Sequence, residues 1–168
     1  MVNQNIIQSK DSITIDGVVL HYRLKPIKSK DGFINDLEHS STKNWNNTNK
    51  HMWYYRKWKD MRTRSKNKGI EVSASWKTFS NFAKDLSDFR NNNKPFYALD
   101  KDLLSNGKRI YSKETCVLLP QSINYYLSDK HSENNKVLKK TLLKHLRLFK
   151  DNLDASVYNK IESYRSTL

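Results

Sequence analysis

The segment from Leu99 to Asn124 constrains the fold more than any other part of the sequence. Two apolar runs flank the turn Ser105-Asn106-Gly107-Lys108, and Pro120 follows the second run. Asn-Gly between apolar runs indicates a hairpin or a tight turn. Proline favours the first turn of a helix, where its missing N–H has no partner to lose. The segment therefore predicts a strand, a loop, a second strand and a helix. Asp100 would end the first strand, and Asn124 would lie about one turn into the helix.

This segment resembles the HNH (ββα-metal, His-Me finger) endonuclease unit of many phage-encoded proteins. The phrase from Tyr111 to Cys116, YSKETC, is similar to the YSPETC signature of the phage subgroup. Residues upstream also follow the pattern of that subgroup: Trp58, Met61, Arg62, Gly69-Ile70-Glu71-Val72, Trp76, Phe79 and Phe82. The similarity covers residues 53 to 127. It implies a ββα-metal fold and metal-dependent cleavage of DNA.

The resemblance also implies a site. Asp100 and Asn124 match the two metal ligands of the family, and such oxygen ligands suit Mg²⁺ or Mn²⁺. Lys101 stands where the family has its catalytic His. A base must take a proton from water, and the candidates are Lys101, Asp102 and His131. Lys101 has the alternative role of a charged donor that clamps a phosphate. Asp and Asn at strand ends and helix starts also often serve only as caps or turn formers, which is the structural alternative.

The charge of the chain favours nucleic acid as its partner. Lys and Arg number 31 against 17 acids, a net charge of +14. A protein this basic attracts polyanions, DNA first and an anionic membrane surface second. Aromatic side chains alternate with the basic ones between residues 50 and 68, a pattern that suits phosphate contacts and base stacking. The candidate DNA-binding residues are Lys50, Arg56, Lys57, Lys59, Arg62, Arg64, Lys66, Lys68, Lys108 and Arg109.

Other features of the composition exclude several classes of protein. Cys116 is the only cysteine, so the chain has neither an internal disulfide framework nor a cysteine-based zinc site. The first ten residues have no apolar core of a leader peptide, and no apolar run is long enough to span a membrane. We therefore expect no membrane association and a cytoplasmic location, the bacterial host cytoplasm if the protein is phage-encoded.

The rest of the chain predicts an α+β protein with an N-terminal β-hairpin, two helices, a ββα-metal-like unit and a C-terminal helical hairpin. Asp16-Gly17 between apolar runs predicts a type I′ hairpin, because both central residues need a positive φ. We expect a flexible arm over 1–10, a linker over 23–50 with a short helical turn near 34–39, and helices over 51–66 and 76–90, the second capped by Ser75. The predicted segments are 1–50 with the hairpin, 51–128 with the HNH-like unit, and 129–168 as a basic helical tail.

Three functions stay open from the sequence. The chain is a small HNH-type endonuclease, a non-catalytic DNA-binding protein on the same fold, or a protein that binds a host factor. The Apetala-two-type DNA-binding domain that often precedes the tail in such proteins is replaced here by the short polar segment 128–135. DNA binding must therefore depend on the basic helix and the tail. Metal-dependent cleavage, DNA binding without cleavage, or a protein complex without DNA affinity would distinguish the three.

Overall fold

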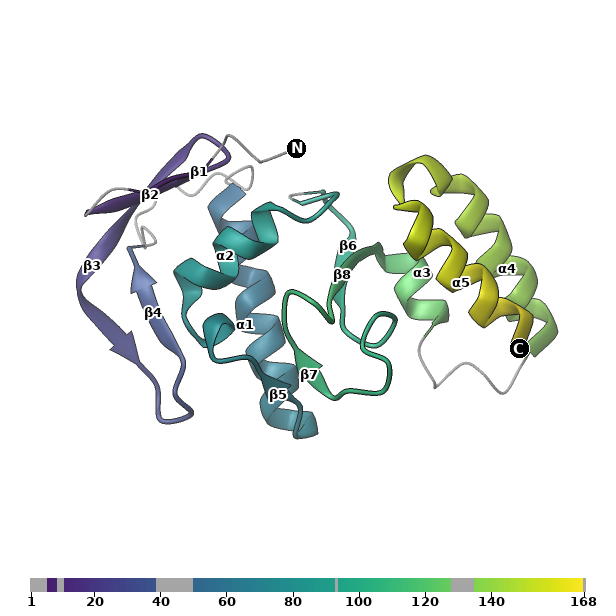
Figure 1. The fold of residues 1–168 in the computed structure, drawn as a ribbon, viewed down its shortest axis with the longest axis horizontal. Helices are drawn as coiled ribbons and strands as arrows, with labels where there is room; N and C mark the ends of the chain where they lie inside the picture. The colour runs from purple at the N-terminus through teal and green to yellow at the C-terminus, as the bar shows by residue number, and fades with distance from the viewer. Residues whose placement is uncertain (1–5, 9–10, 39–49, 93, 128–134, 168) are drawn as a thin grey trace.

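The computed structural model describes residues 6–8, 11–38, 50–92, 94–127 and 135–167. The described chain is an α+β protein with three small sheets and five α-helices (Figure 1). The strands are β1 (Ile6–Gln8), β2 (Ser12–Ile15), β3 (Val18–Lys28), β4 (Ile34–Leu37), β5 (Glu71–Val72), β6 (Tyr97–Asp100), β7 (Ile110–Tyr111) and β8 (Val117–Pro120). The helices are α1 (Lys50–Lys68), α2 (Phe79–Ser87), α3 (Gln121–Tyr126), α4 (Asn135–Leu148) and α5 (Ala155–Thr167), with 3₁₀ turns η1 (Ser75–Lys77) and η3 (Lys150–Asn152).

The N-terminal sheet contains the predicted hairpin and two strands that the sequence did not indicate. Asp16 and Gly17 have φ of 50° and 77°, as a type I′ turn requires. β1 pairs with β2, so residues 6–8 form a strand where an arm was expected; residues 1–5 and 9–10 lie outside the described part. The prediction of a helical turn near 34–39 is wrong, because residues 34–37 form β4, which pairs with β3. Buried and half-buried side chains alternate along β4, the period of a strand with one face on the core.

Helix α1 packs its apolar stripe into the larger of two apolar cores. Tyr54, Trp58 and Met61 are at most 3% exposed, as their spacing predicts. The indole Nε1 of Trp58 donates to the carbonyl oxygen of Trp76 at 2.9 Å, so the one polar atom of this buried ring is satisfied. The helix ends before Gly69, whose φ of 59° is the left-handed conformation that suits a residue following a helix.

Helix α2 is shorter than the predicted helix over 76–90. Ser75 begins the 3₁₀ turn η1, and the N-cap of α2 is Thr78, without a side-chain capping bond. The carboxylate of Asp36 in β4 takes over the capping role, since it accepts the backbone N–H of Ser80 at 2.9 Å and the Ser80 hydroxyl. Ser75 was therefore the wrong cap, because a residue distant in the sequence supplies the acceptor that the helix end needs.

The predicted order of strand, loop, strand and helix is present. Strand β6 is followed by a loop that contains β7, then by β8 and then by α3. β6 and β8 are antiparallel, with Leu99 opposite Leu118. The Asn-Gly turn in the loop is a tight turn, closed by the Lys108 N–H on the Ser105 carbonyl at 3.1 Å. It does not join paired strands, because β7 pairs in parallel with β5. Pro120 ends β8 and is the N-cap of α3, one residue earlier than the helical position we expected.

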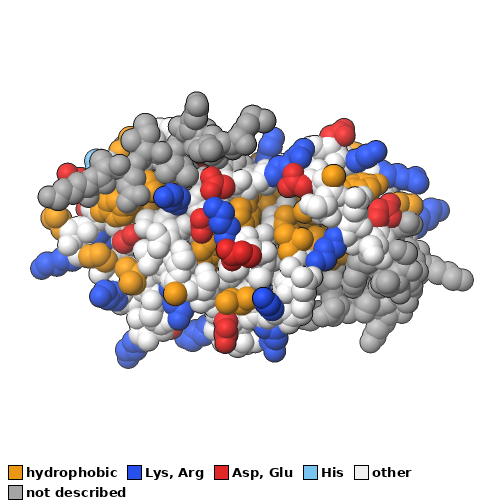
Figure 2. Space-filling model, in the orientation of Figure 1, with side chains coloured by type: hydrophobic (Ala, Val, Ile, Leu, Met, Phe, Trp, Pro, Cys, Tyr) orange, Lys and Arg blue, Asp and Glu red, His pale blue; other side chains and the backbone are white. Residues whose placement is uncertain are grey.

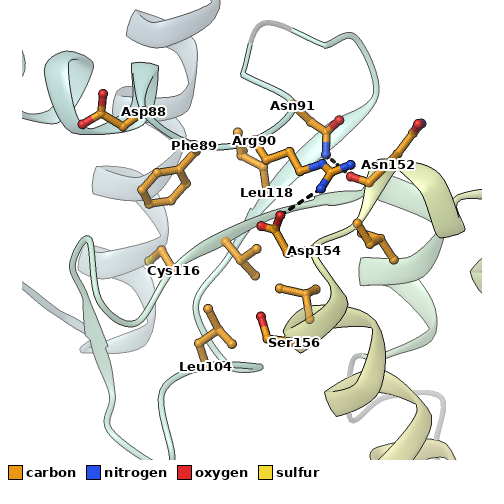
Figure 3. Close-up of a pocket in the computed structure, with 13 residues that line it drawn as sticks. Asp88, Phe89, Arg90, Asn91, Leu104, Cys116, Leu118, Asn152, Asp154 and Ser156 are labelled. Atoms are coloured by element: carbon orange, nitrogen blue, oxygen red, sulfur yellow. Dashed lines mark hydrogen bonds and ion pairs between the residues drawn. The ribbon is translucent and has the colours of Figure 1, made fainter. Parts of the chain in front are cut away.

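The C-terminal hairpin of α4 and α5 packs on β8 and α3 through a second apolar core. This core joins Leu119 and Ile123 to five buried residues of the tail: Leu142, Leu146, Leu153, Val157 and Ile161. Polar contacts fasten the other end of the hairpin, where Arg90 bonds Asp154 at 3.0 Å and Asn91 donates to the Asn152 carbonyl at 2.6 Å (Figure 3). No helix in the described part of the chain is long and apolar enough to cross a membrane.

Candidate metal and nucleic-acid site

Asp100 and Asn124 line one cleft of about 620 Å³, which we call the Asp100 cleft. Its walls come from α1, β6 and the following loop, β7, α3 and α5. The charged and amide side chains that line it are Arg64, Lys68, Asp100, Lys101, Asp102, Arg109, Asn124 and Lys160. The strand end and the helix thus converge on the same space, as the local order of elements predicts.

Asp100 is a buried carboxylate held by backbone amides. The residue is 8% exposed, and its Oδ1 accepts the N–H of Asp102 at 3.1 Å and of Leu103 at 2.9 Å. Burial raises the pKa of the Asp100 carboxyl, and the hydrogen bond from Leu103 opposes the rise. Among the described residues, no Lys, Arg or His forms an ion pair with Asp100. A cation placed in the cleft would therefore find a desolvated carboxylate without a competing ion pair.

Asn124 is the second predicted metal ligand in the lining of the cleft. It is the fourth residue of α3, it is half-buried, and it lines the Asp100 cleft. A carboxylate and a carboxamide are hard donors of the kind that Mg²⁺ and Mn²⁺ take, and Mg²⁺ commonly uses only one or two protein ligands beside water and phosphate. Within the described residues, no group of three His, Cys, Asp or Glu side chains could hold a metal. The two residues fit a weakly ligated divalent ion and do not fit a closed structural metal site.

Lys101 and Asp102, which both line the Asp100 cleft, form an ion pair. The Lys101 ammonium bonds the Asp102 carboxylate, and the two side chains are 11% and 75% exposed. An ammonium group that bonds a carboxylate is a charged donor, which fits the phosphate-clamping alternative for Lys101. The role of either residue as a base stays a prediction. The third candidate base, His131, lies outside the described residues.

Three of the predicted DNA-binding cations line the Asp100 cleft. Arg64 donates to the Leu99 carbonyl at 3.5 Å, and Arg109 donates to the Lys68 carbonyl at 2.8 Å. These bonds place Arg64, Lys68 and Arg109 around the carboxylate end of β6. A phosphate in the cleft would therefore meet guanidinium and ammonium groups from α1 and from the residue that precedes β7.

The remaining predicted DNA-binding cations do not line the Asp100 cleft. Lys57 is half-buried beside the Tyr97 carbonyl, to which it donates, and burial lowers the pKa of its ammonium. Arg62 bonds Asp31 on the other side of α1, where Lys66 also lies. Three more of the predicted DNA-binding cations are exposed: Arg56, Lys59 and Lys108. The side chain of Lys50 lies outside the described part of the chain.

Lys160 joins the Asp100 cleft without any signal in its local sequence. It belongs to α5, and its ammonium donates to the Asn106 side-chain oxygen at 3.0 Å, which brings the tail to the Asn-Gly turn. Only the packing of the tail on α3 places this cation near Asp100. Elsewhere the charges are mixed, and the face shown in Figure 2 carries Lys and Arg side chains over its whole length with Asp and Glu among them.

No protein-family model, curated protein or solved structure matches this chain. The function proposed below therefore depends on the geometry and chemistry of the Asp100 cleft.

Proposed function

We propose that this chain binds DNA at the Asp100 cleft and cleaves its phosphodiester bonds with Mg²⁺ or Mn²⁺ held by Asp100 and Asn124. The observation that carries the proposal is the convergence of these two oxygen donors on a cleft whose other charged side chains are mostly cations. The order of strand, loop, strand and helix is also the order of the HNH unit that the sequence resembles.

The charge balance of the Asp100 cleft supports a phosphate-bearing ligand. Five cations and two carboxylates line it, and one of the carboxylates bonds Lys101. Such a cleft attracts polyanions and concentrates them near Asp100. Contacts of this kind dominate affinity for DNA and weaken as salt rises.

The residues of the Asp100 cleft would have separate roles in binding the ion and in orienting the DNA. Asp100 and Asn124 would hold the ion, which when bound stabilises negative charge on the phosphate and on the leaving oxygen. Arg64, Lys68 and Arg109 would orient the DNA backbone, and the Lys101 ammonium would donate to a phosphate oxygen after exchange from Asp102.

The test is incubation of supercoiled plasmid with the protein in Mg²⁺, in Mn²⁺ or in EDTA. We expect metal-dependent nicking that Asp100→Ala abolishes. Lys101→Ala shows whether this lysine takes part. Asp151→Ala removes an exposed carboxylate outside the cleft and is the matched control. Nicking that persists in Asp100→Ala would place the activity elsewhere or in a contaminant.

The second candidate is a DNA-binding protein without nuclease activity. The ion pair between Lys101 and Asp102 favours it, because the position of the family's catalytic His holds a paired ammonium group. A gel shift without cleavage in either metal would establish this function. A chain that neither shifts nor cleaves DNA would direct the search to a protein partner, such as a host factor.

A further inference from the structure

A second cleft of about 480 Å³, the Phe96 cleft, adjoins the Asp100 cleft. It is lined by residues of α1, of β6 and its preceding residue, and of α3. Arg64 and Asn124 line both clefts, so the two hollows lie on either side of the same pair of side chains. A ligand that passes these two residues enters the Phe96 cleft.

Phe96 has two features that a residue of purely structural role would avoid. Its side chain is 82% exposed, which leaves a large apolar ring in water. Its φ is 62°, in the left-handed region, where a bulky residue is an outlier. Single exposed apolar residues are common on protein surfaces, but exposure on a strained backbone beside a polar cleft indicates a functional position.

The backbone around Phe96 is held in place by neighbouring elements. The Gln121 N–H at the start of α3 donates to the Phe96 carbonyl at 2.7 Å, and Lys57 of α1 donates to the next carbonyl, that of Tyr97. The ring therefore projects from an anchored position. Three residues of β6 lie between Phe96 and Asp100, and the four residue steps span about 13 Å along an extended strand.

We propose that the Phe96 cleft binds an unpaired nucleobase of the DNA strand, with the Phe96 ring stacked on the base. This inference rests on the function proposed above, since it assumes that the DNA backbone crosses the Asp100 cleft. Arg64 and Lys57 supply cations for the intervening phosphates, and Gln121 carries an amide that both donates to and accepts from a base edge. Aromatic stacking tolerates any base, because every base has a π-face.

The test compares two single-stranded probes of equal length, a deoxythymidine oligonucleotide and an abasic deoxyribose-phosphate oligonucleotide, in EDTA. Phe96→Ala should weaken binding of the deoxythymidine probe about tenfold and leave binding of the abasic probe unchanged. Phe96→Trp should restore the affinity, because Trp also stacks. Leu148→Ala, which truncates another exposed apolar side chain (72% exposed) outside both clefts, is the matched control. Thermal melting of each variant verifies the fold.

Two results would overturn the inference, and they differ in what they say of the proposed function. Equal effects of Phe96→Ala on both probes would exclude stacking, while salt-dependent binding by the wild type would keep the proposal of DNA binding. Failure of the wild type to bind either probe would overturn this inference, whereas plasmid nicking by the same preparation in Mg²⁺ would show that the proposed cleavage of duplex DNA still holds.

Discussion

The guanidinium group of Arg62 donates two hydrogen bonds to the carboxylate of Asp31, of 2.9 Å and 3.0 Å. The pair joins the middle of α1 to the turn between β3 and β4. The ring of Phe33 lies against the same guanidinium, 5.3 Å from its carbon. Arg62 therefore links the N-terminal sheet to α1, and its contact with DNA stays a prediction.

The Arg62–Asp31 pair predicts a loss of stability in acid. The hydrogen bond from Arg62 lowers the pKa of Asp31 from 3.8 to about 2. Asp31 thus favours the folded state above the unfolded value of 3.8, and this contribution is lost as the pH falls from about 4 to about 2. Both side chains are more than a third exposed, so we expect less than about 1 kcal/mol.

Urea unfolding of the wild type and of Asp31→Asn as a function of pH measures this contribution. The wild type should be the more stable at neutral pH, and the difference should vanish near pH 2. Arg62→Ala should show the same pH-dependent loss together with a pH-independent loss, because it also removes the contact with the Phe33 ring. A difference that stays constant across the range would show that the pair acts through packing and not through charge.

The cations of the Asp100 cleft should control the salt dependence of DNA binding. We expect the triple variant Arg64→Gln, Lys68→Gln and Arg109→Gln to reduce the slope of log affinity against log salt by about 2 to 3, because each lost phosphate contact removes about 0.7 to 0.9. The matched control neutralises three exposed lysines that lie outside the cleft and were not predicted to bind DNA: Lys25, Lys84 and Lys94. Both triple variants lose the same net charge, so equal slopes would show that position on the surface does not matter. Fluorescence anisotropy at several salt concentrations provides the slopes.

Asp100→Asn should stabilise the fold at neutral pH and remove its response to Mg²⁺. Burial raises the pKa of Asp100, so this side chain favours the folded state in acid, and that contribution is lost as the pH rises through the folded value. The amide removes the buried charge and still accepts the backbone N–H groups of Asp102 and Leu103. Thermal melting in EDTA measures the stability of each protein, and the rise of the melting temperature with Mg²⁺ measures its response to the ion. A melting temperature of Asp100→Asn that Mg²⁺ raises as much as that of the wild type would place the ion elsewhere.

Asp36→Ala should destabilise α2 and its attachment to the N-terminal sheet, which contains Asp36 in β4. The variant loses the acceptor for the Ser80 N–H and the Ser80 hydroxyl, and loss of a helix cap costs about 1 to 2 kcal/mol. Asp36→Asn keeps one acceptor oxygen and should cost less. The free energy of unfolding in urea measures both variants. Equal stability of Asp36→Ala and the wild type would show that water replaces the cap.

Local patterns in the sequence predicted the elements that depend on neighbouring residues. The stripe of Tyr54, Trp58 and Met61, the Asp16-Gly17 turn and the β6–β8–α3 order all depend on residues within a few turns of one another. These features place Asp100 and Asn124. The convergence of the two side chains followed from the order of elements alone.

Features that depend on distant pairing could not be predicted in this way. β4 forms because β3 runs past the hairpin and offers an edge, and β5 pairs with β7 across an intervening helix and strand. The same applies to the candidate site, since Lys160 reaches the Asp100 cleft only through packing of the tail. The exposed Phe96 is another case, because no pattern in its local sequence indicates a positive φ or an exposed ring.

Two adjacent residues of β8 belong to different cores. Leu118 lies in the larger core with α1 and α2, and Leu119 lies in the smaller core with α4 and α5, because successive side chains of a strand point to opposite faces. Neither core can lose its contacts to β8 without disturbing the strand that supports the other. Amide protons of β6 and β8 should therefore exchange with solvent only when the whole molecule unfolds, whereas those of α5 exchange through local detachment of the tail. Such a detachment would carry Lys160 away from the carboxylate end of β6 and open the cleft from one side.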